Sequence, residues 1–299
     1  MSSLAFIFPG QGAQRPGMGR PLFDAHPEAR RAFAFAGENL CRDMEALCFD
    51  TPAPSLARTE NAQPALFTVS MAAHWVCEAA GLRPSAVAGF SLGECAALCA
   101  AGYLSWADGL QLVRVRADAM QQAADTHPGA MAAVLGLPWD TVESLCHPSG
   151  GAVRPVNDNA PGQCVVAGTP DAVDGLSRAA AGLGAKIVPL PVSAAFHTPD
   201  MAGAGATLEA FMRRSLPPIE HGAIPLYANL TGLPLAPGAD LPAIMAAQMQ
   251  NPVRWRQSIL AMCADGIDTF VEVGEGRTLS ALVRRIDRNA KILPLPFIS

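Results

Sequence analysis

The chain has 299 residues and a formal net charge of −5; half of its residues are hydrophobic and 16% are charged. This balance is typical of a globular chain with an apolar core and excludes an extended, disordered chain. Lys and Arg are scattered rather than clustered, so the sequence offers no basic surface for nucleic acid, and we predict no nucleic-acid partner.

No signal for secretion, membrane insertion or metal binding is found in the sequence. The N-terminal residues lack a basic segment followed by a long apolar stretch. The two longest stretches without a charged residue, 61–77 and 221–239, contain polar side chains or several prolines, which argues against a membrane span. The eight cysteines include no C-x-x-C pair, and no two histidines lie at metal-ligand spacing. We therefore predict a cytoplasmic protein with reduced cysteines, no metal and no membrane contact.

The first part of the chain has the order of a parallel α/β sheet. The apolar run Leu4–Phe8 predicts a buried strand that leads into a glycine-rich loop. Further patterns predict helices at 24–40 and 64–80, a strand at 85–90, and helices at 92–101 and 105–124. We expect the second of these helices to begin at Pro64, because proline favours the first turn of a helix. A strand, a glycine turn and a helix in succession are typical of parallel sheets.

The segment that follows has a different order. Its pattern predicts a strand at 131–137, a helix at 139–146, strands at 153–156 and 163–167, a helix at 170–183 and a strand at 186–190. The order β-α-β-β-α-β is that of a ferredoxin-like unit. We therefore predict that residues 128–191 form a ferredoxin-like subdomain, inserted into an α/β catalytic domain formed by residues 1–127 and 192–299.

The last part of the chain returns to alternating helices and strands. The pattern predicts a helix at 200–215, a strand at 224–228, helices at 240–250 and 253–265, a strand at 269–273 and a helix at 278–286. The predicted fold class is therefore α/β, with a hydrolase-like parallel sheet in the main domain and an inserted ferredoxin-like α+β subdomain.

A nucleophile motif lies between the predicted strand at 85–90 and the helix that follows it. Residues 89–93, GFSLG, match G-x-S-x-G, in which a serine occupies a sharp turn and the flanking glycines avoid side-chain collisions. The backbone N–H after the serine lies at a helix N-terminus, where it can stabilise an oxyanion. The motif and its position favour a catalytic Ser91 over an ordinary turn.

A serine hydroxyl needs a base to act as a nucleophile. Five of the six histidines lie in polar loops, beside prolines or within an apolar helix, at positions 26, 74, 127, 147 and 221. His197 instead follows a predicted strand and precedes Thr198-Pro199, a helix start. Loops at the strand ends of α/β folds commonly carry catalytic groups. These patterns make His197 a candidate base and leave open whether it is the base.

Seven motifs occur between Phe8 and about Ile286. They are FPGQGAQ (8–14), GFSLGE (89–94), LVRVRADAMQ (112–121), NAPGQCVVAG (159–168), AAFHTPDM (194–201), NPVRW (251–255) and FVEVGEGRTL (270–279). In this order they resemble the malonyl-CoA:acyl-carrier-protein transacylases, the family that comprises the enzyme of fatty acid synthesis and the acyltransferases of polyketide synthases.

The resemblance implies roles for several residues. Ser91 becomes acylated, and His197 takes its proton and later activates the incoming thiol. The oxyanion hole consists of the backbone N–H groups of Gln11 and Leu92. In the family a backbone carbonyl, near the segment that holds Gln248, orients the histidine in place of a carboxylate, so we predict a Ser–His dyad.

The resemblance also implies that Arg116 binds the free carboxylate of the malonyl group. A guanidinium suits this task because its planar fork matches a carboxylate and is always charged. Arg114 is the competing candidate, and the R-x-x-x-M-Q spacing favours Arg116. Gln11 and Gln248 are expected to line the same pocket, and Asn159 to brace the site from the inserted subdomain.

Two departures from the family pattern, at positions 90 and 117, and one further residue, Phe196, bear on the acyl pocket. Phe90 precedes the nucleophile where the family usually has histidine, which removes a polar group beside Ser91, and Ala117 stands where glycine is common. The triplet Ala195-Phe196-His197 resembles that of polyketide acyltransferases that select malonyl over methylmalonyl. In these enzymes the phenylalanine narrows the acyl pocket. One methylene is worth only about 1–3 kcal/mol of discrimination.

The implied reaction is a ping-pong transfer from malonyl-CoA, through Ser91, to the phosphopantetheine thiol of an acyl-carrier protein. The resemblance implies no bound cofactor, since malonyl-CoA is a substrate and the partner carries the phosphopantetheine, and it implies a monomer. Arg284, Arg285 and Arg288 are candidates for contact with the acidic carrier protein, a solvated helix face being the alternative.

Other functions stay open at this point. An acyltransferase of the same fold could be specific for another acyl group. A serine esterase or thioesterase would share the serine turn but would need no arginine clamp. A non-catalytic docking subunit would need none of these side chains. Both fatty acid and polyketide synthesis are compatible with the sequence.

Overall fold

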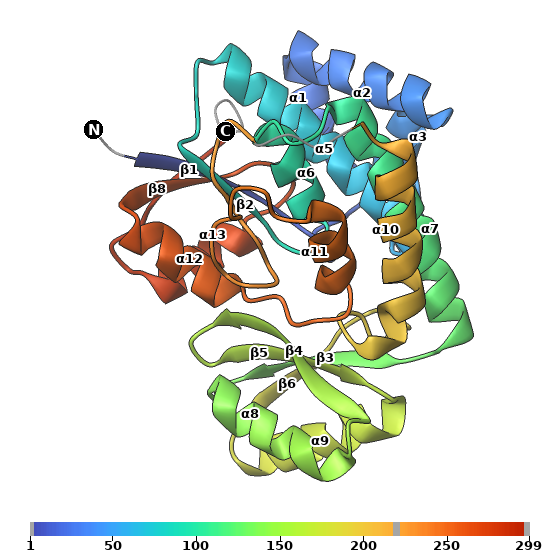
Figure 1. Ribbon diagram of the computed structural model, residues 1–299, viewed down its shortest axis with the longest axis vertical. Coiled ribbons are helices and arrows are strands. Elements are labelled where there is room, and N and C mark those ends of the chain that lie inside the picture. Colours follow the sequence, from blue (N-terminus) through green and yellow to red (C-terminus); the bar gives the residue numbers. More distant parts are fainter. Residues whose placement is uncertain (1–2, 218–221, 296–299) are drawn as a thin grey trace.

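A computed structural model describes residues 3–217 and 222–295, which form a larger and a smaller part (Figure 1). The larger part is built on a parallel sheet of five strands in the order β7-β2-β1-β8-β9. Its strands are β1 (Ser3–Phe8), β2 (Ala86–Gly89), β7 (Leu226–Tyr227), β8 (Ile267–Glu272) and β9 (Lys291–Leu293). Because parallel strands need long crossover connections, helices separate successive strands along the chain.

Eleven α-helices accompany this sheet in the described residues. They are α1 (Arg20–Ala25), α2 (Pro27–Leu40), α3 (Met44–Phe49), α4 (Ala53–Leu56), α5 (Thr59–Ala79), α6 (Gly93–Ala100), α7 (Trp106–Thr126), α10 (Ala202–Ser215), α11 (Leu241–Gln248), α12 (Trp255–Ala264) and α13 (Thr278–Ile286). None of the helices in residues 3–217 and 222–295 has both the length and the apolar character that crossing a membrane requires.

The two faces of the parallel sheet pack on different helices because successive residues of β1 point in opposite directions. Phe6 and Phe8 belong to a core that also contains side chains of α2, α5, α6 and α7. Ala5 and Ile7 belong to a second core, formed with α12 and α13 on the opposite face (Figure 1). Burial on both faces explains why β1 is an uninterrupted apolar run rather than an alternating one.

The smaller part contains an antiparallel sheet with the strand order β4-β5-β3-β6. Its elements are β3 (Ala130–Leu135), α8 (Trp139–Cys146), β4 (Val153–Ala160), β5 (Gln163–Gly168), α9 (Pro170–Gly182) and β6 (Lys186–Pro189). Helices α8 and α9 cover the face of this sheet that points away from the larger part (Figure 1) and close a core of their own. The predicted α/β fold class with an inserted ferredoxin-like unit is confirmed. The sheet lies within the predicted segment 128–191.

Several predicted element bounds differ from the structure. The helix predicted at 24–40 is two helices, because His26 is extended at φ −125° and Pro27 begins the next helix. The strand predicted at 224–228 is only Leu226–Tyr227. Helices α3 and α4 and strand β9 were not predicted, since segments of three to six residues are too short to show a clear hydrophobic period.

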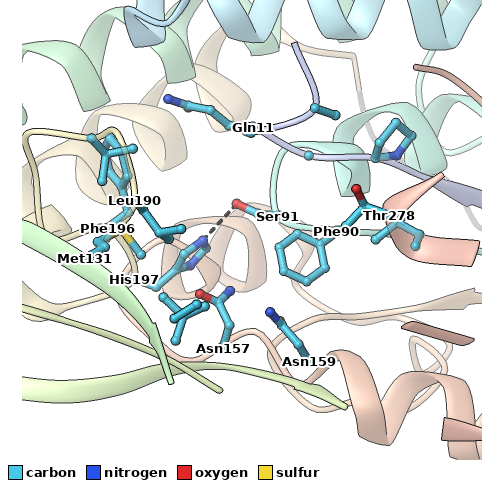
Figure 2. A pocket seen from close by; sticks show the side chains of 18 of the residues that line it. Gln11, Phe90, Ser91, Met131, Asn157, Asn159, Leu190, Phe196, His197 and Thr278 are labelled. Carbon is cyan, nitrogen blue, oxygen red and sulfur yellow. Dashed lines mark hydrogen bonds between the residues drawn. The ribbon is translucent and has the colours of Figure 1, made fainter. Parts of the chain in front are cut away.

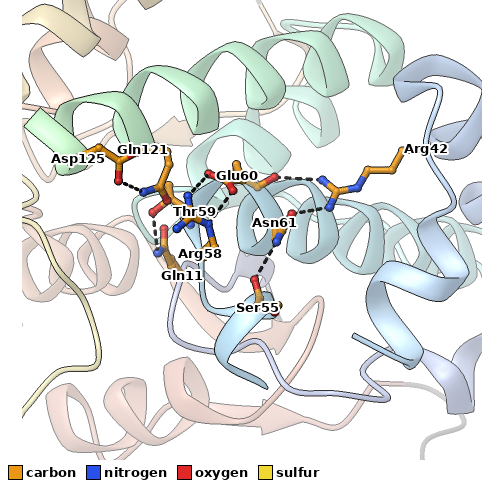
Figure 3. Close-up of polar contacts among 9 residues, drawn as sticks. All are labelled: Gln11, Arg42, Ser55, Arg58, Thr59, Glu60, Asn61, Gln121 and Asp125. Carbon is orange, nitrogen blue, oxygen red and sulfur yellow. Dashed lines mark hydrogen bonds and ion pairs between the residues drawn. The ribbon is translucent and has the colours of Figure 1, made fainter. Parts of the chain in front are cut away.

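The helix expected to begin at Pro64 begins five residues earlier, at Thr59, so Pro64 lies inside α5. Proline has no N–H for the carbonyl of Glu60, four residues before it. The guanidinium of Arg42 donates to that carbonyl instead, at 3.2 Å, and a second nitrogen of Arg42 donates to Asn61 (Figure 3). A side chain from another segment therefore compensates for the proline, which the local sequence could not reveal.

Candidate active site

The serine turn, residues 89–93, connects the end of β2 to the start of α6. Ser91 has a left-handed backbone with φ 52°. The flanking glycines are required sterically, because a Cβ on Gly89 would lie 1.9 Å from the carbonyl carbon of Gly93, and a Cβ on Gly93 would lie 2.1 Å from the carbonyl oxygen of Phe8. The turn is thus pressed against the first strand, and it holds the serine side chain above the carboxyl end of the sheet.

The side chains of Ser91 and His197 form a hydrogen bond, with Oγ 2.8 Å from Nε2 (Figure 2). The other ring nitrogen of His197, Nδ1, lies 2.9 Å from the backbone oxygen of Gln248. A carbonyl oxygen can only accept, so Nδ1 carries the proton and Nε2 is free to accept from Ser91. The pair is therefore arranged for transfer of a proton from the hydroxyl to the imidazole.

Burial keeps His197 neutral. The residue is 5% exposed, and this desolvation lowers the pKa of His197 from 6.5 to about 4. The bond to the carbonyl of Gln248 raises the pKa and the nearby positive charge of Arg116 lowers it, with smaller effects than burial. At neutral pH the imidazole is therefore available as a base.

The guanidinium of Arg116 lies beside the serine–histidine pair. Arg116 is 1% exposed on α7, and its Nη2 donates to Ser91 Oγ and to Gln248 Oε1, each at 3.2 Å, while Nη1 donates to Gln63 Oε1 at 2.8 Å. Its Nε has no hydrogen-bond partner among the described residues. Arg114 is exposed and bonds to Gln111 instead. A buried guanidinium held only by neutral oxygens can accept an anionic partner, which favours Arg116 over Arg114 as the anion-binding group.

Ser91 opens into a cavity of about 280 Å³ between the two parts of the molecule. Figure 2 shows His197, Phe196, Phe90, Gln11 and Asn159 around it, together with residues of β3 and β4. The wall is mainly apolar, and Phe90 packs edge-on against Trp255 with the ring centroids 5.5 Å apart. An apolar wall beside the serine limits the access of water to this side chain.

The two amides predicted for the oxyanion hole belong to loops that meet at the serine turn. Leu92 is the N-cap of α6, and Gln11 follows Gly10, where a Cβ would lie 2.2 Å from the carbonyl oxygen of Phe90. In the described part of the chain no turn or loop hydrogen bond uses either amide. The side chain of Gln11 donates to Thr59 (Figure 3) and accepts from Gln63. Both amides therefore stay candidates for binding an oxyanion.

Three residues that sequence reasoning missed complete the site. Gln63 bonds to Arg116 as described above. Asn229 brackets the serine turn, because its Oδ1 accepts from the N–H of Ser91 and its Nδ2 donates to the carbonyl of Gly89, each at 2.6 Å. Glu94 accepts from the N–H of Asn229 at 3.2 Å and from Nε2 of Gln248 at 2.7 Å. A carboxylate in the otherwise apolar helix 93–100 was the one signal that could have pointed to Glu94.

Glu94 is fully buried, and desolvation raises the pKa of its carboxyl from 4.5 to about 7. The hydrogen bonds from Gln248 and Asn229 and the charge of Arg116 oppose this rise.

Among the described residues no group of three His, Cys, Asp or Glu side chains could hold a metal ion.

The three arginines considered for a carrier protein have different surroundings. Arg285 donates to Gln163 Oε1 at 2.8 Å and to the carbonyl of Pro161 at 3.1 Å, so it joins α13 to the turn between β4 and β5. Arg284 lines a separate cavity of about 660 Å³. Arg288 is exposed. Arg285 is thus already engaged within the molecule.

A serine and a neutral histidine at the carboxyl end of a parallel sheet form the arrangement of α/β enzymes that make an acyl-serine, and here a buried arginine lies beside them. Comparison with known proteins agrees with this class. A family model described as acyl transferase domain matches residues 5–292. The malonyl CoA-acyl carrier protein transacylase of Bacillus subtilis (strain 168) is 38% identical over 297 residues, which is 98% of this chain and 93% of that protein.

Solved structures give the same result. The crystal structure of malonyl-CoA:acyl carrier protein transacylase from Xanthomonas oryzae pv. oryzae is 40% identical and has a TM-score of 0.93, covering 99% of this chain and 95% of that chain. A type II PKS acyl-carrier protein in complex with its malonyl-transacylase matches at 33% identity and a TM-score of 0.93, covering 98% and 96%. The chain therefore belongs to the acyl transferase domain family, and the family predicted from the seven motifs is confirmed.

Proposed function

We propose that the protein transfers a malonyl group from malonyl-CoA, through an ester on Ser91, to the phosphopantetheine thiol of an acyl-carrier protein. The activity is that of a malonyl-CoA:acyl-carrier-protein S-malonyltransferase. The observation that carries the proposal is the buried guanidinium of Arg116, 3.2 Å from the hydroxyl of Ser91. A simple ester or thioester hydrolase has no use for such a charge, whereas a malonyl group brings a free carboxylate to it.

In the first half-reaction Ser91 Oγ attacks the thioester carbon of malonyl-CoA while its proton passes to Nε2 of His197. The negative charge on the thioester oxygen is stabilised by the backbone N–H groups of Gln11 and Leu92. The carbon–sulfur bond then breaks, and the sulfur of CoA takes the proton from His197. The product is a malonyl ester on Ser91 with the histidine neutral again.

The second half-reaction reverses these steps with a different thiol. The phosphopantetheine thiol of the carrier protein enters the same cavity and loses its proton to His197, and the thiolate attacks the ester carbon. Ser91 takes the proton as the ester bond breaks. Between the half-reactions the ester must survive without hydrolysis, for which the apolar wall that includes Phe90 and Phe196 is suited.

The finer features of the proposal follow from the same site. Arg116 selects acyl groups with a carboxylate, and Phe196 beside His197 restricts the room for a substituent, which favours malonyl over methylmalonyl. We further propose that the enzyme needs no bound cofactor and works as a cytoplasmic monomer. Light scattering of the purified protein checks the oligomeric state.

Intact-protein mass spectrometry tests the proposed function. Incubation with malonyl-CoA should add one malonyl group to the wild type and none to the Ser91→Ala variant. Adding a holo carrier protein should remove the group quickly and transfer it to the carrier, whereas buffer alone should remove it slowly. Release of free malonate without a stable adduct would instead identify a hydrolase.

A further inference from the structure

Gln248 contacts all three groups of the proposed reaction. Its backbone oxygen accepts from Nδ1 of His197, its Oε1 accepts from Nη2 of Arg116, and its Nε2 donates to the backbone oxygen of Ser91 at 3.0 Å. The contact with Arg116 exists only if the side-chain oxygen of Gln248, and not its NH₂ group, faces the guanidinium. A rotation of 180° about the last side-chain bond would exchange the two and place donors against donors.

Glu94 stabilises this orientation of the amide. Its carboxylate is an acceptor when ionised, and its Oε2 lies 2.7 Å from Nε2 of Gln248, the shortest of the three side-chain contacts of that amide. With an acceptor on this side, the NH₂ group must face Glu94 and the oxygen must face Arg116. The carbonyl of Ser91 supports the same orientation with a longer bond.

The position of Glu94 fits a supporting role and no chemical one. It is fully buried on α6, three residues after the nucleophile. Like Arg116 and like Gln248, which was expected to line the pocket, it is absent from the cavity wall. Its Oε2 is shared between Gln248 and the backbone N–H of Asn229, while its Oε1 has no hydrogen-bond partner among the described residues. A buried carboxyl with one unpaired oxygen is costly, so its presence at this place calls for a function.

We propose that Glu94 is a positioning residue for acyl-group selection: its Oε2 fixes the amide of Gln248 so that Gln248 Oε1 holds the guanidinium of Arg116 in the orientation that binds the free carboxylate of the substrate. This rests on the proposed function, because it assigns to Glu94 control over the group that recognises malonyl. Glu94 touches neither the substrate nor the reacting atoms, and it acts through Gln248 and Arg116.

The test compares two substitutions of Glu94 whose side chains are about as long as that of glutamate. Glu94→Met removes the acceptor, whereas Glu94→Gln keeps an oxygen where Oε2 lies and places its NH₂ group at the unpaired Oε1 position. The readout is the ratio of the rates at which Ser91 is acylated by malonyl-CoA and by acetyl-CoA, which has no free carboxylate. Glu94→Met should lower this ratio by about tenfold, the effect of one hydrogen bond to a charged group, and Glu94→Gln should stay within about threefold of the wild type.

Glu272→Met is the matched control for the loss of a buried carboxyl. Glu272 is 5% exposed and accepts from the N–H groups of Leu279 and Ser280 at the start of α13. This variant should lose stability and keep the wild-type ratio. Equal losses of the malonyl and acetyl rates in Glu94→Met would overturn the proposal, as would the same fall of the ratio in Glu94→Gln.

If Glu94→Met does not fold, Glu94→Ala, which also removes the acceptor, takes its place and should lower the ratio in the same way. The wild type supplies one further check. In ¹⁵N-labelled protein the side-chain NH₂ protons of Gln248, assigned by their absence in Gln248→Glu, should exchange with solvent far more slowly than those of the exposed Gln122. Exchange as fast as that of Gln122 would overturn the proposal. Failure of the wild type to be acylated by malonyl-CoA would refute the proposed function itself, and a malonylated wild type with unchanged selectivity in Glu94→Met would refute only the role of Glu94.

Discussion

The ring nitrogen Nδ1 of His197 lies 2.9 Å from the backbone oxygen of Gln248, at the place where many serine enzymes have a carboxylate. A carbonyl fixes the tautomer and the orientation of the ring as a carboxylate does. It brings no negative charge, however, so it stabilises the protonated ring less. Burial lowers the pKa of His197 to about 4, and the bond to this neutral carbonyl raises the pKa too little to offset burial.

Replacing His197 by Ala should slow the acylation of Ser91 by malonyl-CoA by about 10²–10⁴-fold, the usual contribution of a general base. The bond between Nε2 and Ser91 Oγ would be lost, and within residues 3–217 and 222–295 the only other titratable side chain bonded to that hydroxyl is the permanently charged Arg116. The rate of mass increase measures the effect. A normal rate would show that another group removes the proton.

Replacing Arg116 by Lys should lower kcat/KM for malonyl-CoA by about tenfold or more and affect acetyl-CoA much less. An ammonium keeps the charge but cannot bond to Gln63, Gln248 and a carboxylate with the geometry of a planar fork. Steady-state kinetics with both donors measures the difference. Arg114→Ala is the control and should behave as the wild type, since Arg114 is exposed; unchanged malonyl kinetics in Arg116→Lys would contradict the clamp.

With acetyl-CoA as donor, whose acyl group makes no carboxylate contact with Arg116, the acylation rate should be independent of pH from about pH 8 down to about pH 5 and fall by half near pH 4. The base works in its neutral form, and the lowered pKa of His197 means that the ring becomes protonated only near pH 4. Single-turnover acylation at a series of pH values, limited to the time before the protein unfolds, measures the midpoint. A midpoint near 6.5 would mean that the ring is more solvated than its burial indicates.

Glu94 should make the free energy of unfolding depend on pH in the opposite sense to an ordinary carboxylate. Its folded-state pKa, about 7, lies above the unfolded value of 4.5, so its contribution to stability is complete below pH 4.5 and is lost as the pH rises through 7. The size of this loss is roughly 3 kcal/mol. Denaturant unfolding between pH 5 and 8 measures the free energy of unfolding of the wild type and of Glu94→Gln. As the pH rises, the wild type should lose stability relative to the variant, and a constant difference between the two free energies would contradict the prediction.

Replacing Phe90 by His should shorten the lifetime of the malonyl ester on Ser91 by about threefold or more, because a polar ring in the cavity wall can hold a water molecule near the ester. Phe90 lies in that wall and packs against Trp255. The decay of the adduct in buffer, followed by mass spectrometry, measures the lifetime. Phe90→Leu, which keeps the wall apolar, should retain the wild-type lifetime.

Hydrophobic patterns predicted the strands and helices in which the pattern continues over many residues. The motifs predicted Ser91, His197 and Arg116, which the structure brings into contact. The supporting contacts could not be predicted. Asn229 accepts from the backbone N–H of Ser91, although the two residues are 138 positions apart in the sequence. No local sequence pattern indicates such a pairing. The early start of α5 likewise depends on Arg42, a residue of a different helix–helix connection.

Both members of the proposed dyad carry conformational strain. Only three non-glycine residues in the described ranges have a positive φ, and two of them are Ser91, at 52°, and His197, at 63°. Such a backbone costs about 1–3 kcal/mol at each position, and glycine would relieve it. Ser91→Gly should therefore yield a protein without turnover but with a higher melting temperature. Directed evolution toward heat resistance alone would favour the loss of these two side chains, so any such selection has to include an assay of acyl transfer.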